Sequence, residues 1–188
     1  MRIFLAVFPP PEVQRAVFAA AEALKRPGDG VSWVKRENLH YTLRFMGELG
    51  EDGARRVGLA ADEAAQTGAA FGAALGALGA FPNARRARVL WAGMTEGGER
   101  LTALAQALEA ALRRKGFDRA EHAFTAHLTI GRVRDPRADW TERLAAVSVE
   151  PGGARFTVDR ICVVESKLSP QGSTYTVVHE ALLAPAGA

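Results

Sequence analysis

Short apolar runs alternate with amphipathic helical segments along the chain, and this alternation limits its fold more than any other feature. The order is strand–helix–strand–strand–helix–strand–strand–helix–strand, followed by more strands. This mixture predicts an α+β protein built as two similar halves. The predicted strands are Arg2–Phe8, Val31–Val34, His40–Phe45, Phe71–Leu78, Val89–Trp91, His127–Arg132, Phe156–Ser166 and Tyr175–Leu182. One predicted helix begins at Pro11 and continues until Pro27–Gly30 stops it, and the others are Asp52–Thr67, Glu99–Lys115 and Trp140–Val147.

Bulk composition excludes some kinds of site and leaves others open. The single cysteine, Cys162, rules out an intramolecular disulfide and a cysteine-based metal site, and its apolar neighbours predict a buried thiol. A formal net charge of +3 permits a polyanionic partner without requiring one. The apolar run Ile3–Phe8 is too short to cross a membrane and ends in prolines. With no heptad pattern either, we expect a soluble, cytoplasmic monomer.

One tetrapeptide pattern occurs twice. His40-Tyr41-Thr42-Leu43 and His127-Leu128-Thr129-Ile130 both read His, apolar or aromatic, Thr, aliphatic. Side chains alternate along an extended strand, so His and Thr share one face in each copy, with the apolar residues behind them. By the same alternation Phe45 belongs to the apolar back face. If the two halves pack symmetrically, both His–Thr pairs face one site.

Two imidazoles at one site suit phosphodiester displacement without a metal. A neutral imidazole takes a proton from the attacking water, and a protonated one gives a proton to the leaving oxygen. Threonine hydroxyls can hold the phosphate oxygens as charge builds on them. No carboxylate cluster lies near either motif and no two histidines are four apart, so we expect neither a metal nor a cofactor. For one motif alone, a structural histidine is the ordinary interpretation; the matched pair favours catalysis.

The residues around these motifs extend the pattern over nearly the whole chain. With them, the sequence resembles the two-histidine phosphoesterase superfamily, and within it the RNA 2′,3′-cyclic phosphodiesterase branch, historically called 2′-5′ RNA ligase. The segments that carry the resemblance are Arg2–Val7, Trp33–Val34, Glu37–His40, Leu43–Gly47, Gly79–Pro82, Phe124–Thr129 and Val164–Ser169.

The resemblance implies a fold and an activity. The fold is bilobal, with two pseudo-symmetric lobes of antiparallel sheet, helices outside and a central cleft, forming a single catalytic domain over residues 1–188. The activity is hydrolysis of RNA 2′,3′-cyclic phosphate ends to 2′-phosphomonoesters, with tRNA fragments among the candidate substrates, and with reversible 2′-5′ joining of RNA ends. His40 would be the proton donor, His127 the proton acceptor, and Thr42 and Thr129 the phosphate-oxygen contacts.

Two arginines are candidate substrate contacts. The family pattern suggests that Arg132, five positions after His127, binds phosphate or ribose. Strict alternation would put it on the opposite face, and a bulge at Gly131 is the feature that would re-aim it. Arg44 lies on the His40 face by alternation, where a substrate contact and a structural ion pair are equally open.

Other residues keep more than one interpretation. The basic run Arg85, Arg86 and Arg88 is a solvated loop or an RNA backbone contact. His122 and His179 have no Thr two positions later and are interpreted as structural or surface residues. Trp33, Trp91 and Trp140 are expected to pack in the core or at its rim.

Two other functions remain open from the sequence. One is a phosphodiesterase with a different substrate, either another small cyclic phosphate or a 2′,5′-linked oligonucleotide. The other is a non-catalytic RNA-binding module. Two positioned imidazoles argue against a pure binder, and turnover of a cyclic-phosphate-ended RNA would separate these functions.

Overall fold

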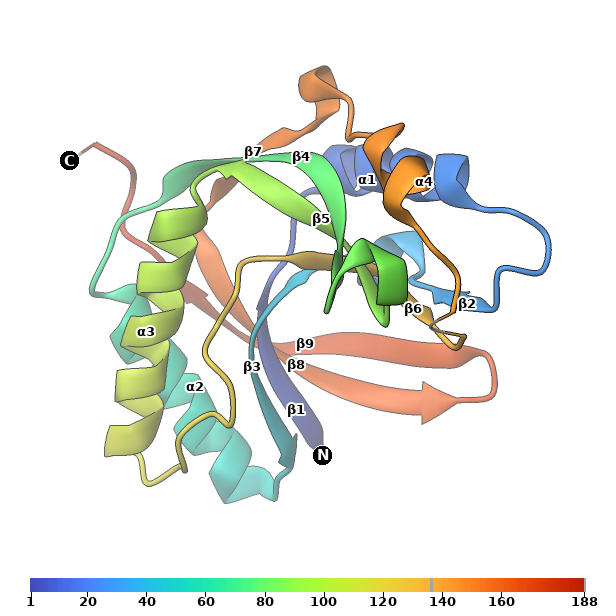
Figure 1. The fold of residues 1–188 in the computed structure, drawn as a ribbon. Coiled ribbons are helices and arrows are strands. Elements are labelled where there is room, and N and C mark those ends of the chain that lie inside the picture. The colour runs from blue at the N-terminus through green and yellow to red at the C-terminus, as the bar shows by residue number, and fades with distance from the viewer. Residues whose placement is uncertain (136, 188) are drawn as a thin grey trace.

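The computed structural model describes residues 1–135 and 137–187. Within them, nine strands form one curled sheet in the order β7-β4-β5-β6-β3-β1-β8-β9, with β2 paired to β6 (Figure 1). The strands are β1 Arg2–Val7, β2 Val31–Trp33, β3 Tyr41–Glu48, β4 Phe71–Phe81, β5 Val89–Glu96, β6 Leu128–Val133, β7 Arg155–Val158, β8 Arg160–Ser169 and β9 Gly172–Leu182. The helices are α1 Pro11–Leu24, α2 Glu51–Ala65, α3 Gly98–Arg114 and α4 Thr141–Ala145, with short 3-10 helices at Arg36–Asn38, Ala84–Arg86 and Pro151–Gly153.

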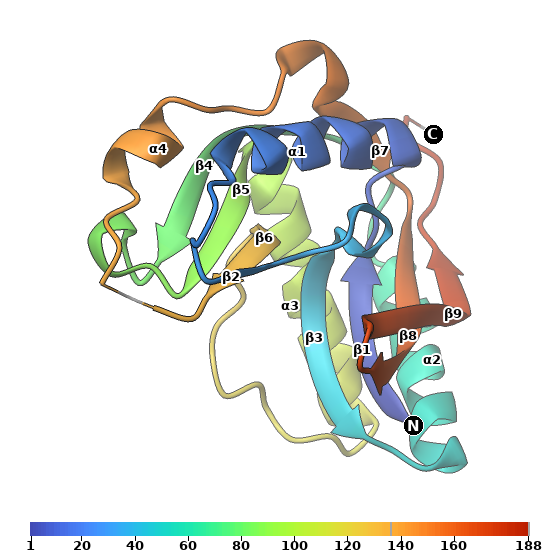
Figure 2. The same cartoon turned by 90° about the vertical axis from the view of Figure 1, so that its right-hand side faces the viewer.

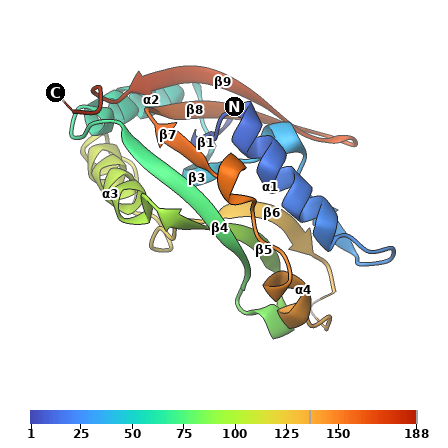
Figure 3. The ribbon, with the colours of Figure 1, turned by 90° about the horizontal axis from the view of Figure 1, so that it is seen from above.

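The helices divide between the two halves of the sheet. Helices α2 and α3 pack on each other and against the half that contains β1, β3, β8 and β9 (Figure 1). Helices α1 and α4 lie against the half that contains β4, β5 and β6 (Figure 2). Seen from above, the curled sheet lies between α1 on one side and α2 with α3 on the other (Figure 3). None of the helices among the described residues has the length and apolar character needed to cross a membrane.

The predicted α+β, two-half architecture is confirmed, and the halves meet at one narrow junction. Strand β3 pairs with β6 through a single register pair, Tyr41 opposite Leu128. Both side chains are fully buried, as their place behind the histidines predicts. They belong to one hydrophobic cluster that runs through both halves. The junction is therefore fixed by core packing rather than by a long ladder of backbone hydrogen bonds.

One strand prediction is wrong. The apolar run Phe156–Ser166 is two strands, β7 and β8, separated at Asp159. Strand β7 pairs with β4 in one half of the sheet, whereas β8 pairs with β1 and β9 in the other. Both strands bury apolar side chains, so the hydrophobic pattern continues across the change of partner and does not reveal it. Strands β8 and β9 form a hairpin that turns between Ser169 and Gly172.

The residues expected to be structural do pack as predicted. Cys162 is buried, and this burial raises the pKa of its thiol to about 11, which leaves it protonated at neutral pH. Trp140 is fully buried beneath the guanidinium of Arg143, which lies 3.9 Å from a ring centroid of Trp140. A ring nitrogen of His179 lies 2.8 Å from an Asp62 carboxylate oxygen, far from both motifs in the sequence.

Candidate active site

The two motifs lie side by side at the junction of β3 and β6. The residue after each histidine forms the register pair of that junction. Extending this antiparallel register by one residue places His40 opposite Thr129 and Thr42 opposite His127. Since the register pair itself points into the core, these four side chains point to the other face of the sheet. Two segments 87 residues apart thus bring two imidazoles and two hydroxyls together.

Both imidazoles are held in the same way. The Nδ1 atom of His40 lies 2.7 Å from the carbonyl oxygen of Asn38, and that of His127 lies 2.7 Å from the carbonyl oxygen of Thr125. A carbonyl only accepts hydrogen bonds, so each Nδ1 carries the proton and donates it. Each Nε2 is then the atom that gains or loses a proton. In His40 it lies 2.8 Å from Oγ1 of Thr42.

The side chain of His40 is packed among aromatic rings, and this burial changes its acidity. Burial disfavours the imidazolium and lowers the pKa of His40, while the hydrogen bond to the Asn38 carbonyl opposes this shift. The positive charges of Arg132 and His127 lower that pKa further, because both groups are close enough to act on it. The ring centroids around His40 are those of Phe4 at 5.0 Å, Phe8 at 5.4 Å and Tyr175 at 5.5 Å.

A bulge in β6 brings Arg132 to the histidine face. Leu90 of β5 pairs with Gly131 and Trp91 with Thr129, so Ile130 is the extra residue. The extra residue shifts the alternation by one, which leaves Arg132 exposed while Val133 is buried. The structure thus contains the bulge that the sequence suggested beside Gly131. Its glycine also has a packing reason, since a Cβ there would come within 2.8 Å of Val31 Cγ1.

A bulge in β3 has the opposite consequence for Arg44. Thr42 pairs with Ala6, and Arg44 pairs with the next residue of β1, Leu5, so Leu43 is the extra residue. Arg44 therefore faces away from His40, and the alternation argument that placed it on the His40 face is wrong. Its guanidinium instead donates to the carbonyl oxygen of Asp118 at 2.6 Å and lies 3.7 Å from a Glu109 carboxylate oxygen.

The same bulge turns Phe45 toward the site. Phe45 was assigned to the back face by alternation, and that assignment is also wrong. It pairs with Phe4, the rings lie 5.9 Å apart, and Phe4 in turn contacts His40. The side chain of Phe45 is 61% exposed, so its ring presents an open apolar surface beside the motif.

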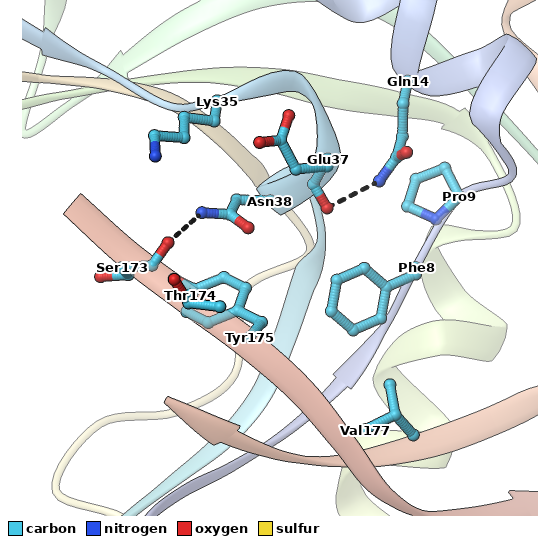
Figure 4. Close-up of a pocket in the computed structure, with 10 residues that line it drawn as sticks. All are labelled: Phe8, Pro9, Gln14, Lys35, Glu37, Asn38, Ser173, Thr174, Tyr175 and Val177. Carbon is cyan, nitrogen blue, oxygen red and sulfur yellow. Dashed lines mark hydrogen bonds between the residues drawn. The ribbon is translucent and has the colours of Figure 1, made fainter. Parts of the chain in front are cut away.

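Sequence reasoning missed the residues that hold His40 in place. Asn38 and Gln14 are buried polar side chains. The Asn38 amide donates to the carbonyl oxygen of Ser173 at 2.9 Å, and the Gln14 amide donates to that of Glu37 at 3.5 Å (Figure 4). The Gln14 amide also donates to the carbonyl oxygen of Leu39 at 3.0 Å. These bonds fix the backbone whose carbonyl holds His40. The only available signal was a pair of polar residues next to apolar ones.

Two hollows lie near the motifs. One, of about 400 Å³, is lined by Phe8, Asn38 and Tyr175 among others (Figure 4). These three residues also contact His40. The other, of about 600 Å³, begins at Pro82. The preceding residue, Phe81, packs edge-on against His127 with ring centroids 5.0 Å apart.

The donor set around the site does not form a metal-binding group. Among the described residues, no three His, Cys, Asp or Glu side chains are grouped so that they could hold a metal ion. The polar groups that converge are two imidazoles, two hydroxyls and the guanidinium of Arg132. Such a set can transfer protons and bind an anion.

Comparison with known proteins decides the family. The model of the 2′-5′ RNA ligase superfamily matches residues 9–169. This chain belongs to that superfamily. Among curated relatives, an RNA 2′,3′-cyclic phosphodiesterase of Methanothermobacter thermautotrophicus is 34% identical, covering 94% of this chain and 95% of the relative. One of Archaeoglobus fulgidus is 35% identical, covering 93% and 96%.

Solved structures of superfamily members have the same fold. A Thermus thermophilus protein superposes with a TM-score of 0.79 at 30% identity, covering 99% of this chain and 100% of that one. Escherichia coli LigT, solved as a complex with 3′-AMP, superposes with a TM-score of 0.76 at 26% identity, covering 97% of each chain. The bilobal α+β arrangement inferred from the sequence is thereby confirmed.

Proposed function

We propose that this chain hydrolyses 2′,3′-cyclic phosphates at RNA ends, leaving a 2′-phosphomonoester and a free 3′-hydroxyl. The observation that carries the proposal is the convergence at the β3–β6 junction, where two imidazoles with tethered Nδ1 atoms face one side together with two threonines. The curated relatives are named for this activity. Each half supplies one motif, so residues 1–188 act as one catalytic unit, and we take it to be a monomer.

The reaction follows from the state of the two Nε2 atoms. Neutral His127 removes a proton from water as the water oxygen forms a bond to phosphorus. The bond from phosphorus to O3′ breaks, and protonated His40 gives its Nε2 proton to that oxygen. The phosphate stays on O2′, and both histidines then return to their starting states by exchange with solvent. No electron transfer is involved, and we propose that neither a metal nor a cofactor is needed.

Three further side chains bind the non-bridging oxygens of the phosphate, where negative charge builds. Thr42 and Thr129 donate their hydroxyl protons to the two non-bridging oxygens. Arg132, which the β6 bulge turns to this face, pairs with the same anion. On the other side of the junction, Phe45 offers its exposed ring to the terminal base or ribose.

The lowered pKa of His40 is compatible with its role as the acid. In the free enzyme, burial makes the neutral form of His40 more abundant. A bound phosphate anion opposes this effect, because a negative charge near Nε2 favours the imidazolium. When protonated, a histidine of lowered pKa is also a stronger acid, which helps the departure of O3′.

A substrate with sulfur in place of O3′ tests the roles directly. A thiolate leaves without protonation, so the loss of activity in His40→Ala should be largely restored on this substrate. The loss in His127→Ala should persist, because water still has to be activated. The reverse pattern would exchange the two roles.

Product analysis tests the reaction itself. The protein is incubated, in the presence of EDTA, with RNA oligomers that end in a 2′,3′-cyclic phosphate. One of these oligomers is a tRNA fragment. The expected product carries its phosphate on the 2′ oxygen alone. A 3′-phosphate product, or a strict need for added metal, would refute the mechanism. Adding an RNA with a 5′-hydroxyl end shows whether the same site also forms a 2′-5′ linkage.

A further inference from the structure

The hollow beside His127 is lined almost wholly by cations. Its lining residues are Pro82, Arg85, Arg86, Arg88 and Arg137. Arg85 and Arg86 lie in the 3-10 helix after β4, and Arg88 follows that helix. Arg137 comes from the segment after β6. All four side chains are exposed. We call these four residues the arginine groove.

The groove is locally positive. Its described lining carries four guanidinium groups and no carboxylate. Among the described residues, Arg85, Arg86 and Arg88 have no acidic side chain within salt-bridge distance. Arg137 is partly neutralised, because its Nη2 lies 2.7 Å from an Asp135 carboxylate oxygen. This contact lowers the pKa of Asp135 to about 2, so the carboxylate stays ionised at neutral pH.

The backbone connects this groove directly to the catalytic face. Phe81 packs against His127, and Pro82, which follows it, lines the groove. The N–H of Arg88 donates to the carbonyl oxygen of Phe81 at 2.7 Å, which brings the ends of the loop together. The next residue, Val89, pairs in register with Arg132 of β6. The groove therefore begins where the phosphate-facing residues end.

We propose that the arginine groove binds the sugar–phosphate backbone of the RNA chain beyond the reacting nucleotide. Guanidinium groups match phosphate oxygens in charge and in hydrogen-bond geometry. None of the described lining residues is aromatic, so the groove contacts phosphates and does not read base identity. This inference rests on the proposed function in one respect, the choice of RNA as the bound polymer. Such a groove would make the enzyme selective for RNA ends over cyclic mononucleotides.

Replacement of all four groove arginines by glutamine tests this inference. On a single-stranded hexanucleotide ending in a 2′,3′-cyclic phosphate, KM at low salt should rise by about tenfold or more. On a 2′,3′-cyclic mononucleotide, kcat/KM should stay within about twofold of its starting value, because that substrate does not reach the groove. The matched control replaces four exposed arginines elsewhere, namely Arg2, Arg15, Arg100 and Arg113. This control makes the same change in net charge and should leave the hexanucleotide KM unchanged.

Binding without turnover separates this inference from the proposed function. Fluorescence anisotropy measures the Kd of a labelled RNA hexanucleotide with an ordinary 3′-hydroxyl end. The groove variant should bind it more weakly, and the slope of log Kd against log salt should fall by up to about 3, as expected for four lost contacts to a single strand. Asp135→Asn should tighten binding, because it frees Arg137 from its carboxylate partner.

Each outcome decides the matter. Equal losses in the groove and control variants would show a general charge effect and overturn the inference, as would an unchanged RNA affinity. An acidic peptide or anionic vesicles that bind as tightly as RNA through the same arginines would overturn the assignment to RNA. If neither cyclic phosphate is hydrolysed, the proposed function fails, and anisotropy still decides the groove.

Discussion

The strand after His40 and the strand after His127 have the same backbone design but carry different chemistry. In both, the third residue after the histidine is the extra residue of a bulge, Leu43 in β3 and Ile130 in β6. In both, the bulge therefore turns the fifth residue to the histidine face. That residue is Phe45 in one half and Arg132 in the other. The symmetry of the fold thus sets the positions, and the sequence decides which side chain each position presents.

The surroundings of the two histidines also differ, and again the aromatic residues gather around His40. His40 is packed among Phe4, Phe8 and Tyr175, whereas the described aromatic partner of His127 is Phe81 alone. Burial shifts the acidity of His40 away from that of a free imidazole. The two halves therefore hold their histidines on similar backbones but in unequal surroundings.

Loss of either imidazole should have the largest effect. His40→Ala and His127→Ala should each lower kcat by about a hundredfold or more, because each removes one proton transfer from the transition state. Each variant should also lose one limb of the bell-shaped pH dependence of kcat/KM, and the two lost limbs should be different. Steady-state rates across the pH range measure both effects. If both variants lost the same limb, the two halves would not have the separate roles assigned to them.

Replacing either residue that a bulge turns to the histidine face should have an intermediate effect on KM. Arg132→Ala should raise KM by about tenfold while changing kcat less, because it removes a cation that pairs with bound phosphate. Phe45→Ala should raise KM by about fivefold through lost stacking. Phe45→Tyr, which keeps the ring, is its control. If KM were unaffected by Arg132→Ala and raised by Phe45→Tyr, the contrast between charge and stacking would not hold.

The packing around His40 should control its acidity. Phe8→Ala removes one wall and lets water reach the ring, so the pKa of His40 should rise from its lowered position. NMR titration of the His40 ring protons measures this shift, with Phe18→Ala on α1 as the control for a lost phenyl ring elsewhere. A further decrease in the pKa of His40 would show that burial is not its cause. The change in kcat should be within about threefold.

Arg44 should matter least for the reaction. Arg44→Gln should leave KM within about twofold of its starting value, because the β3 bulge turns this side chain away from His40. It should lower the free energy of unfolding by about 1 kcal/mol, because the hydrogen bond to Asp118 and the ion pair with Glu109 are lost. Urea denaturation measures the second effect. A large increase in KM would show that Arg44 contacts the substrate.

Much of this architecture follows from the sequence, because most of its strands and helices have their own hydrophobic period. The paired motifs predicted which histidines and threonines converge, since core residues behind them had to share one interior. Alternation failed where the backbone departs from a regular strand. The bulge beside Gly131 was anticipated from a glycine and a family pattern, whereas that at Leu43 has no glycine to mark it. Asn38 and Gln14 act through backbone carbonyls, which no residue pattern encodes.

The wall around His40 also has a consequence for the order of assembly. Strand β1 comes from one end of the chain and β9, with Tyr175, from the other, so the surrounding of this histidine closes only when distant segments meet. During synthesis, both motifs are made before β8 and β9. Until this hairpin docks, the side of His40 that Tyr175 contacts stays open to water. This histidine acquires the acidity of the mature enzyme only when the final hairpin docks.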